Sequence, residues 1–319
     1  MRSLFPHQKG CFMRIIFMGT PDFAVPSLEI LLQHGYDIPA VVTAPDKPGG
    51  RLGMLESAVK KCAVAHGIPV LQPEKLKNPE FLAQLRDLNA DLQIVVAFRM
   101  LPEAVWAMPP LGTLNLHGSL LPKYRGAAPI NWAVINGETE TGVTTFLLRH
   151  EIDTGDILFQ EKIPIGENET AGELYERMMH IGARLVLHTV QALENGTARA
   201  LPQQNTAATH APKIFTETCR IQFGQPSEAV HNFIRGLSPH PGAWTIFDGK
   251  TLKIFRSEKV GQQKTGGLEA GRFFSDGKNY LAVGTQDGFV KVLELQIEGK
   301  KRMQVREFLN GYKYAWEPL

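Results

Sequence analysis

The sequence predicts an α/β protein with a Rossmann-like, mostly parallel sheet in its N-terminal domain and a small β-barrel in its C-terminal domain. Over the first hundred residues, short apolar runs alternate with helical patterns, which is typical of parallel strands covered by helices. After residue 212, short β-branched runs separated by glycine-bearing turns replace that alternation, which favours a small antiparallel domain.

The N-terminal elements follow from local signals. A buried strand is predicted at 14–19, ended by Gly19, and a helix at 25–33, where Pro26 suits the first turn and Gly35 lies just beyond the end. The same alternation predicts further strands at 38–43, 69–71 and 92–98 and further helices at 56–66 and 80–88.

A long helix is predicted from residue 170 onwards. Thr170 and Glu173 form a capping box, and Gly196 is the expected stop. Four apolar side chains follow at helical spacing, and we interpret them as core: Leu174, Met178, Ile181 and Leu185.

Domain limits follow from composition. Residues 199–212 are rich in Gln, Asn, Thr and Ala with little hydrophobicity, which indicates a linker between domains at 13–198 and 213–319. The C-terminal domain has a predicted helix at 227–236 and Asp-Gly hairpin signals at Asp248 and Asp287. Residues 1–12 are expected to be an extension without signal-peptide character; either Met13 is the native start or the extension is a dispensable arm.

The composition excludes several classes. The chain has 319 residues, of which 43% are hydrophobic and 21% charged, and this balance is typical of a globular protein rather than a disordered or fibrous one. Its apolar runs are too short for a bilayer span. Cys11, Cys62 and Cys219 show no metal or disulfide spacing, so we expect no metal, no membrane and a cytoplasmic location.

Charge is distributed unevenly along the chain. Residues 213–319 hold 16 Lys and Arg against 11 Asp and Glu, whereas residues 1–212 hold 18 against 21. A positive C-terminal domain is a modest indication of a polyanionic partner. Ordinary variation in composition explains the same numbers equally well.

The edge of the predicted parallel sheet is where a ligand is expected. Ligands of such folds bind outside the carboxyl ends of the strands, which here are residues 19–21 and 97–99. The first strand-helix turn has no G-x-G-x-x-G pattern, so the sequence gives no support for dinucleotide binding.

The most informative stretch supplies an amide, an imidazole and a carboxylate. Asn115 and His117 stand two residues apart in a strand-like run, so both side chains can face one pocket while Leu116 faces the core. Asp153, in the run Asp-Thr-Gly-Asp, is the candidate carboxylate. Such a set suits acyl transfer to an amine.

Two other interpretations of these residues remain. Ser119 lies close enough to His117 to suggest a serine hydrolase, but the G-x-S-x-G pattern is absent and the serine is better suited to shaping the turn. Alternatively, Asn115 and His117 are satisfied polar groups at a strand end while Asp153 caps a turn. Asp156 is interpreted as structural rather than catalytic.

The run from Asn115 to Gly126, N-L-H-G-S-L-L-P-K-Y-R-G, resembles the signature of the folate-dependent formyltransferases. Further similarity lies at 17–24, 127–130 and 236–244. The resemblance implies transfer of the formyl group of 10-formyltetrahydrofolate to the α-amine of methionine on initiator tRNA. It also implies that the C-terminal barrel is OB-like and binds tRNA.

The resemblance, with the chemistry of the side chains, implies roles for the three groups. Asn115 donates to the oxyanion that forms during transfer, and His117 accepts or relays the proton of the amine. Asp153 holds the imidazole tautomer and stabilises its cation. No serine or cysteine nucleophile is needed, because the amine attacks directly.

The resemblance also implies contacts with both substrates. Folate contacts are expected from the sheet edge and the loop after the histidine: Val95, Val96, Ala97, Phe98, Ser119, Leu120, Leu121 and Pro122. Contacts with tRNA are expected from basic residues: Lys47, Arg51, Lys123, Arg125, Lys300, Lys301 and Arg302. Short charge runs such as 123–126 and 300–302 can also be solvated surface.

The sequence departs from the family pattern in two places. Arg99 stands where many relatives have glycine, which leaves the folate pocket uncertain, and Leu52 to Glu56 replace further lysines expected in a basic loop. We expect a monomer. The alternatives left open are a formyltransferase acting on a small amine, either a purine precursor or an amino sugar nucleotide, and a non-catalytic tRNA-binding relative.

Overall fold

The structure is a computed structural model that describes residues 13–49, 53–260 and 269–319. It contains two compact units. The first comprises the described residues up to Gly126 together with Gly142–Ile163 and Tyr175–His210. The second comprises Ala127–Thr141, Pro164–Leu174 and Ala211–Leu319. The predicted extension 1–12 and the predicted tRNA contact Arg51 lie outside the described residues.

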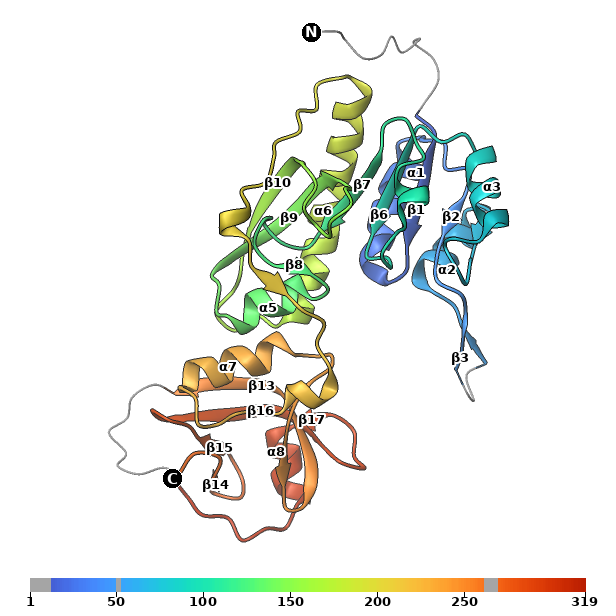
Figure 1. The fold of residues 1–319 in the computed structure, drawn as a ribbon. Helices are drawn as coiled ribbons and strands as arrows, with labels where there is room; N and C mark the ends of the chain where they lie inside the picture. Colours follow the sequence, from blue (N-terminus) through green and yellow to red (C-terminus); the bar gives the residue numbers. More distant parts are fainter. Residues whose placement is uncertain (1–12, 50–52, 261–268) are drawn as a thin grey trace. The chain divides into compact units, whose positions relative to one another are not determined.

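A seven-stranded sheet with the order β10-β9-β7-β6-β1-β2-β5 forms the centre of the first unit (Figure 1). Its middle strands β7, β6, β1, β2 and β5 pair in parallel, and β9 pairs antiparallel with β7. The strands are β1 Ile15–Gly19, β2 Val41–Val42, β5 Val70–Leu71, β6 Leu92–Val96, β7 Thr113–His117, β9 Glu140–Leu147 and β10 Ile157–Pro164. The predicted Rossmann-like sheet is confirmed.

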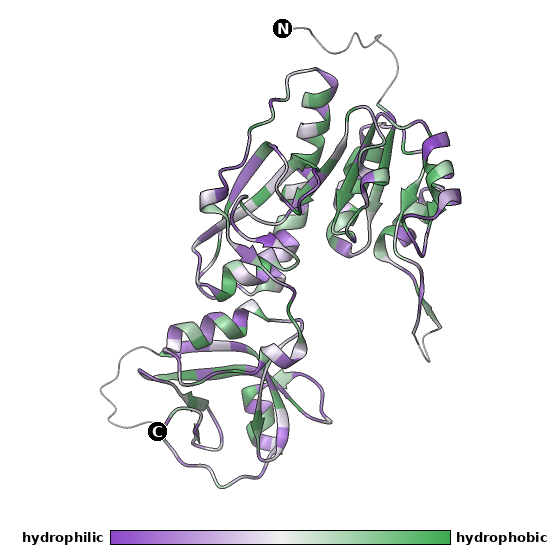
Figure 2. Cartoon of the chain, in the orientation of Figure 1, coloured by the Kyte–Doolittle hydropathy of each residue, from purple (hydrophilic) through white to green (hydrophobic). Residues whose placement is uncertain are grey.

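The central strands β1 and β6 are buried along their whole length and are mostly apolar, because helices cover the sheet. All five residues of β1 and all five of β6 are buried, and this part of the sheet is mostly green in the hydropathy view of Figure 2. Phe81 and Leu85 of α3 pack on this sheet against Met18 and Val95. The helices of this unit are α1 Val25–Gln33, α2 Ala58–Ala65, α3 Pro79–Asp87 and α4 Glu103–Trp106, with the 3-10 turn η1 at Asp22–Ala24. The long helix α6 Ala171–Glu194 belongs to it from Tyr175 onwards, whereas α5 Pro129–Ile135 belongs to the second unit.

The predicted capping box is present at the start of α6. The Thr170 backbone N–H donates to Glu173 Oε2 at 2.9 Å, and the Glu173 N–H donates to Thr170 Oγ1 at 3.2 Å. Beyond the helix, Gly196 has φ +67, the left-handed conformation that glycine allows at a helix end. Among the described residues, no helix is both long and apolar enough to cross a membrane.

Short elements connect these pieces. The two-stranded pairs are β3 Lys47–Pro48 with β4 Met54–Leu55, and β8 Arg125–Gly126 with β11 His210–Ala211. A 3-10 turn, η3, spans Asn205–Ala207 within the predicted linker.

The second unit contains an antiparallel sheet with the order β12-β13-β16-β15-β14, to which β17 is added on β16. Its open order makes a curled half-barrel (Figure 1), which confirms the predicted small barrel-like C-terminal domain. The elements are η4 Thr216–Cys219, α7 Ser227–Gly236, β12 Ala243–Phe247, β13 Lys250–Val260, β14 Phe273–Ser275, β15 Leu281–Gly284, β16 Phe289–Ile297, β17 Met303–Gln304 and α8 Val305–Gly311.

The core of this unit lies between the sheet and α7. Val230 and Ile234 of α7 and Leu252 and Ile254 of β13 belong to one buried cluster. The predicted hairpin turn joins β12 to β13, with φ +49 at Asp248 and φ +69 at the following glycine. Two consecutive left-handed residues are the requirement of a type I′ turn, which Asp-Gly meets at low cost.

Candidate active site

Strand β7 carries the two polar side chains that the sequence singled out. Asn115 is opposite Val95 of β6 and Phe146 of β9. The side chain of Leu116 approaches α6 so closely that a Cβ atom added at Gly182 would lie 2.7 Å from Leu116 Cδ2. Because side chains alternate along a strand, Asn115 and His117 occupy the face opposite α6. The predicted orientation of Leu116 is therefore confirmed.

The imidazole of His117 is buried, with 7% of the residue exposed. Its Nε2 atom lies 2.8 Å from the carbonyl oxygen of Tyr124. A carbonyl only accepts, so we assign the hydrogen of the neutral ring to Nε2, and Nδ1 then holds the lone pair. Nδ1 is therefore the ring atom that is able to take a proton.

The third group faces that atom. Asp153 Oδ2 lies 3.8 Å from His117 Nδ1, too far for a hydrogen bond but close enough to form an ion pair once the ring is protonated. The same oxygen accepts the backbone N–H of Gly126 at 2.9 Å. The structure thus brings His117 and Asp153 together. It differs from the sequence prediction in one respect, since the Tyr124 carbonyl, rather than Asp153, fixes the tautomer.

Asp153 lies in the loop between β9 and β10, and the loop geometry explains its orientation. Asp153 has φ +53, in the left-handed region that Asp tolerates better than most residues. A Cβ atom added at Gly155 would lie 1.7 Å from the Leu147 carbonyl oxygen, so only glycine allows the loop to pass this close. Asp156 pairs with Arg149, in agreement with its structural interpretation.

The loop after His117 is fixed by hydrogen bonds to its own backbone and to β9 and β10. Ser119 is fully buried and its hydroxyl donates to the Lys123 carbonyl at 2.6 Å. Thr144 donates to the Ser119 carbonyl at 2.6 Å, and Gln160 donates to the Leu121 carbonyl at 2.9 Å. Because the Ser119 hydroxyl is used to close the turn, the serine-hydrolase interpretation gains no support.

The end of β6 lies beside Asn115 at the carboxyl edge of the sheet, where the folate contacts were predicted. Val95 and Val96 are buried at 6% and 0% exposure. Ala97 is exposed and has φ +48, and Phe98 is half-buried. At the carboxyl end of β6 the backbone of Ala97 and Phe98 is therefore available for contacts, while the two valines contribute to the core.

Arg99, the departure from the family pattern, turns toward a neighbouring loop. Its guanidinium donates to the carbonyls of Pro73 and Glu74, the latter at 2.8 Å, and lies 5.5 Å from the ring centroid of Phe98. Burial lowers the pKa of this side chain from its ordinary value. These contacts direct the long side chain to the loop that follows β5.

The basic residues predicted to contact tRNA differ in their surroundings. Lys47, Lys123, Lys300 and Lys301 are exposed. Arg302 forms two hydrogen bonds with Glu294, at 2.7 and 2.6 Å, and lies 4.4 Å from the centroid of the Phe255 ring. Arg125 donates to the side chains of Gln203 and Asn205.

Within residues 13–49, 53–260 and 269–319, no cluster of His, Cys, Asp and Glu side chains is suited to hold a metal.

Three contacts of the site were missed from the sequence. The Tyr124 carbonyl and the Gly126 N–H are backbone groups, which no side-chain pattern identifies. Gln203 binds the loop that carries Asp153, but it lies in a polar stretch that composition marks as linker. The only signal in the sequence was a pair of glutamines after Pro202, and nothing in it distinguishes Gln203 from Gln204.

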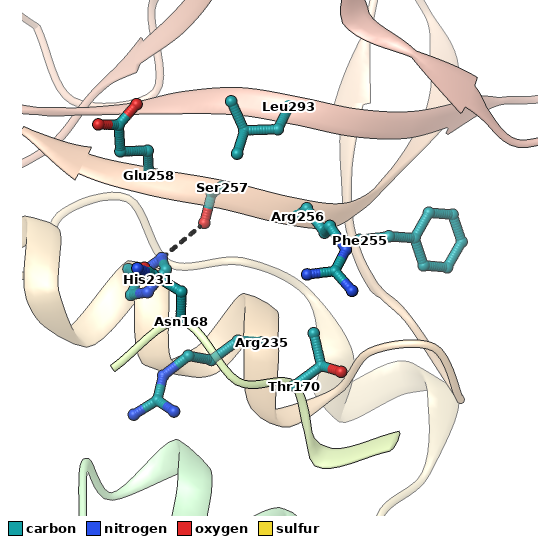
Figure 3. A pocket seen from close by; sticks show the side chains of 9 residues that line it. All are labelled: Asn168, Thr170, His231, Arg235, Phe255, Arg256, Ser257, Glu258 and Leu293. Atoms are coloured by element: carbon teal, nitrogen blue, oxygen red, sulfur yellow. Dashed lines mark hydrogen bonds between the residues drawn. The ribbon is translucent and has the colours of Figure 1, made fainter. Parts of the chain in front are cut away.

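A separate cavity of about 230 Å³ lies within the second unit (Figure 3). The polar groups beside it are already paired: His231 Nδ1 lies 3.0 Å from Ser257 Oγ, and Arg235 donates to the Asn232 side chain at 2.8 Å. The cavity is lined by Asn168, Thr170, His231, Arg235, Phe255, Arg256, Ser257, Glu258 and Leu293. These contacts indicate a structural polar network of this unit.

Comparison with known families agrees with this arrangement. Residues 13–190 match the family model described as Formyl transferase, and residues 213–313 match the one described as Formyl transferase, C-terminal domain. The chain belongs to the formyl transferase family.

Two similar proteins each carry the description methionyl-tRNA formyltransferase. The one from Bacteroides fragilis is 53% identical over 310 residues, which cover 94% of this chain and 95% of that protein. The one from Parabacteroides distasonis is 53% identical over 317 residues, covering 96% and 97%. An N-formyltransferase of Helicobacter canadensis, solved with folinic acid and dTDP-3-aminofucose, aligns with a TM-score of 0.68 at 22% identity over 92% of this chain and 100% of that one, which shows the shared fold.

Proposed function

We propose that this protein transfers the formyl group of 10-formyltetrahydrofolate to the α-amine of methionine carried by initiator tRNA. The extended identity to proteins described as methionyl-tRNA formyltransferases, across both family domains, supports the substrate pair. The single observation that supports the chemistry is the position of His117 Nδ1, which carries the lone pair of the ring and faces Asp153 Oδ2 at 3.8 Å.

The proposed reaction uses direct attack by the amine. The amine lone pair forms a bond to the formyl carbon, and the carbonyl electrons move to oxygen, where the Asn115 side-chain amide donates a hydrogen bond. His117 Nδ1 accepts one proton of the amine. Asp153 stabilises the imidazolium through its negative charge. The electrons on the oxygen then re-form the carbonyl while the bond from the formyl carbon to the folate nitrogen breaks, and His117 returns the proton to that nitrogen.

The sheet edge gives the proposed location of the folate. Ala97 and Phe98 offer backbone donors and acceptors next to the strand position of Asn115, and the loop 119–122 follows His117 directly. Backbone groups suit the hydrogen-bonding edge of a pterin ring, and these segments follow directly after the ends of strands β6 and β7, which anchor them. We propose these two segments as the walls of the folate site.

We further propose that the domain at 13–198 performs the chemistry, that the domain at 213–319 binds tRNA, and that residues 199–212 connect them. Lys47, Lys300 and Lys301 are exposed cations suited to phosphate contacts. The protein is proposed to act as a cytoplasmic monomer, in keeping with a role in translation initiation.

A transfer assay with labelled formyl groups tests the proposed function. Purified protein and 10-formyltetrahydrofolate are offered, in separate reactions, methionyl initiator tRNA, methionyl elongator tRNA, free methionine, a purine-precursor amine and an amino sugar nucleotide. The labelled product of each reaction is counted, after deacylation for the two tRNAs. We expect product only with initiator tRNA. Product with a purine-precursor amine or an amino sugar nucleotide instead would establish the small-amine alternative, and tRNA binding without any product would establish a non-catalytic tRNA-binding protein.

A further inference from the structure

Gln203 links the two loops that surround the proposed catalytic imidazole. Its side-chain Nε2 donates to the carbonyl oxygens of Asp153 at 2.9 Å and Gly155 at 2.7 Å. Its Oε1 accepts from Arg125 Nη2 at 2.7 Å and from Arg125 Nε at 3.2 Å. Both hydrogens and both acceptor sites of the amide are therefore used.

The first loop needs such support because its backbone is in an unfavourable conformation. Asp153 has φ +53, and non-glycine residues occupy this region only when the surroundings hold them there. Gln203 binds the carbonyl of Asp153 itself and the carbonyl two residues later, so it spans the turn. This turn directs Asp153 Oδ2 to the Gly126 N–H and toward His117 Nδ1.

The second loop reaches Gln203 through Arg125. This arginine lies between Tyr124, whose carbonyl binds His117 Nε2, and Gly126, whose N–H binds Asp153. Holding the Arg125 side chain therefore fixes the segment that supplies both backbone contacts. The Gln203 amide thus connects the segment that holds the Tyr124 carbonyl, on the Nε2 side of the His117 ring, to Asp153, on the Nδ1 side.

We infer that Gln203 is a positioning residue for formyl transfer, acting by holding Asp153 in register with His117. This inference rests on the proposed function and deepens it, since it assigns a role in the reaction to a residue of the stretch predicted as linker. Gln203 is half-buried, whereas its neighbours Pro202 and Gln204 are exposed, so the contacts rather than general packing define its position.

Two substitutions separate its contacts. Gln203→Ala removes all of them, and Gln203→Glu keeps an acceptor for Arg125 while losing both donors to the Asp153 and Gly155 carbonyls. Because both variants remove support of the turn, each is expected to lower kcat by roughly 10- to 100-fold, a loss comparable to that of a partner that orients a ligand in a metal site. KM for both substrates is expected to stay within about threefold, because the binding surfaces are retained. Gln204→Ala, an exposed neighbour, serves as the matched control with wild-type kinetics.

A double-mutant cycle distinguishes positioning from a merely structural role. Because Gln203 is inferred to act through Asp153, Asp153→Ala with Gln203→Ala should be no slower than Asp153→Ala alone. Rates that multiply in the double variant, or wild-type kcat in Gln203→Ala and Gln203→Glu, would overturn the inference. A melting temperature measured for each variant shows whether the fold is retained, and a change of kcat that follows the melting temperature would also count against positioning.

The outcome for the inference is separable from that for the proposed function. Absence of formyl transfer by the wild-type protein, or wild-type turnover in Asp153→Ala, would count against the proposed function itself. A slow Asp153→Ala variant together with an unimpaired Gln203→Ala variant would leave the proposed function in place and reject the positioning role alone.

Discussion

The carbonyl oxygen of Tyr124 lies 2.8 Å from His117 Nε2, and this contact determines which ring nitrogen is available for chemistry. Tyr124 has φ +60, a conformation that directs the chain back over the imidazole. The hydrogen of the neutral ring stays on Nε2, and the lone pair on Nδ1 faces the carboxylate. A buried base of fixed tautomer needs little rearrangement before it accepts a proton.

Replacement of the imidazole tests the proposed base. His117→Ala is expected to lower kcat by roughly 10²- to 10⁴-fold, the usual contribution of a positioned acid-base group. Steady-state formyl transfer to charged initiator tRNA measures the change. His180→Ala removes an exposed histidine of α6 and is the control. Equal turnover in both variants would exclude His117 as the base.

The amide of Asn115 is expected to contribute through its N–H donor. Asn115→Ala should lower kcat/KM by about 10²- to 10³-fold, or roughly 2.7 to 4 kcal/mol, as for other donors to an oxyanion. Asn115→Asp has the same size but places a negative charge beside the forming oxyanion, so its loss should be greater. The ordering of the two variants is the measurement, with the exposed Asn195→Ala as control. An aspartate variant faster than the alanine variant would contradict the oxyanion role.

The charge of Asp153 can be separated from its hydrogen bond. Asp153→Asn keeps an acceptor for the Gly126 N–H, and asparagine also tolerates the left-handed φ. We expect a near wild-type melting temperature with a loss of at least about tenfold in kcat, because the imidazolium loses its counter-charge. Asp153→Ala should in addition lower the melting temperature. If Asp153→Asn turns over at the wild-type rate, the carboxylate charge has no part in the reaction.

Gly155 tests how strongly the loop geometry controls the site. In Gly155→Ala the new Cβ atom would lie 1.7 Å from the Leu147 carbonyl oxygen, so the loop must move and carry Asp153 with it. We expect a large loss of kcat and a lower melting temperature. Gly224→Ala is the matched control, since no atom lies within 4 Å of the added Cβ there. An unimpaired Gly155→Ala variant would show that the loop has freedom that the structure does not suggest.

The lowered pKa of His231 leads us to expect that the stability of the second unit depends on pH. Burial lowers the pKa of this histidine below its ordinary value of 6.5; the charges of Arg235 and Lys259 lower it further, while Glu167 raises it. Because the unfolded chain binds the proton more readily, the stabilising contribution is complete above about pH 6.5 and is lost as the pH falls toward the lowered pKa.

Urea unfolding followed by tryptophan fluorescence between pH 7.5 and pH 5 measures this effect. His231→Asn, which keeps an acceptor for Ser257 but does not titrate, should reduce the decline at low pH (Figure 3). The same decline in the wild type and in His231→Asn would assign it to other groups.

Much of the fold could be predicted because local and tertiary signals agree. The capping box at Thr170 and the Asp-Gly turn at Asp248 need no knowledge of distant contacts. Strand β6 shows the limit: the apolar run predicted a strand over 92–98, yet it ends at Val96 because Ala97 has φ +48. This bend depends on the position of Ala97 at the carboxyl end of a central strand, and one sequence alone does not reveal that position.

The site could be predicted in part for the same reason. Strand alternation was enough to place Asn115 and His117 on one face. The contacts of the imidazole with Tyr124 and Asp153 join residues that lie 7 and 36 positions away in the chain, and their geometry depends on left-handed backbone at both partners. The contacts of Gln203 could not be predicted either, since the sequence of a polar stretch does not distinguish a solvated glutamine from one whose amide is fully hydrogen-bonded.

The close contact between Leu116 and Gly182 means that strand β7 packs, on the face away from Asn115 and His117, against a point of helix α6 that carries no side chain. Even a methyl group there would press on Leu116, and the force would reach the residues on either side of it. Variation in helix α6, remote from every reacting atom, can therefore tune or abolish turnover. A protein engineer who wishes to alter this helix should leave residue 182 unchanged.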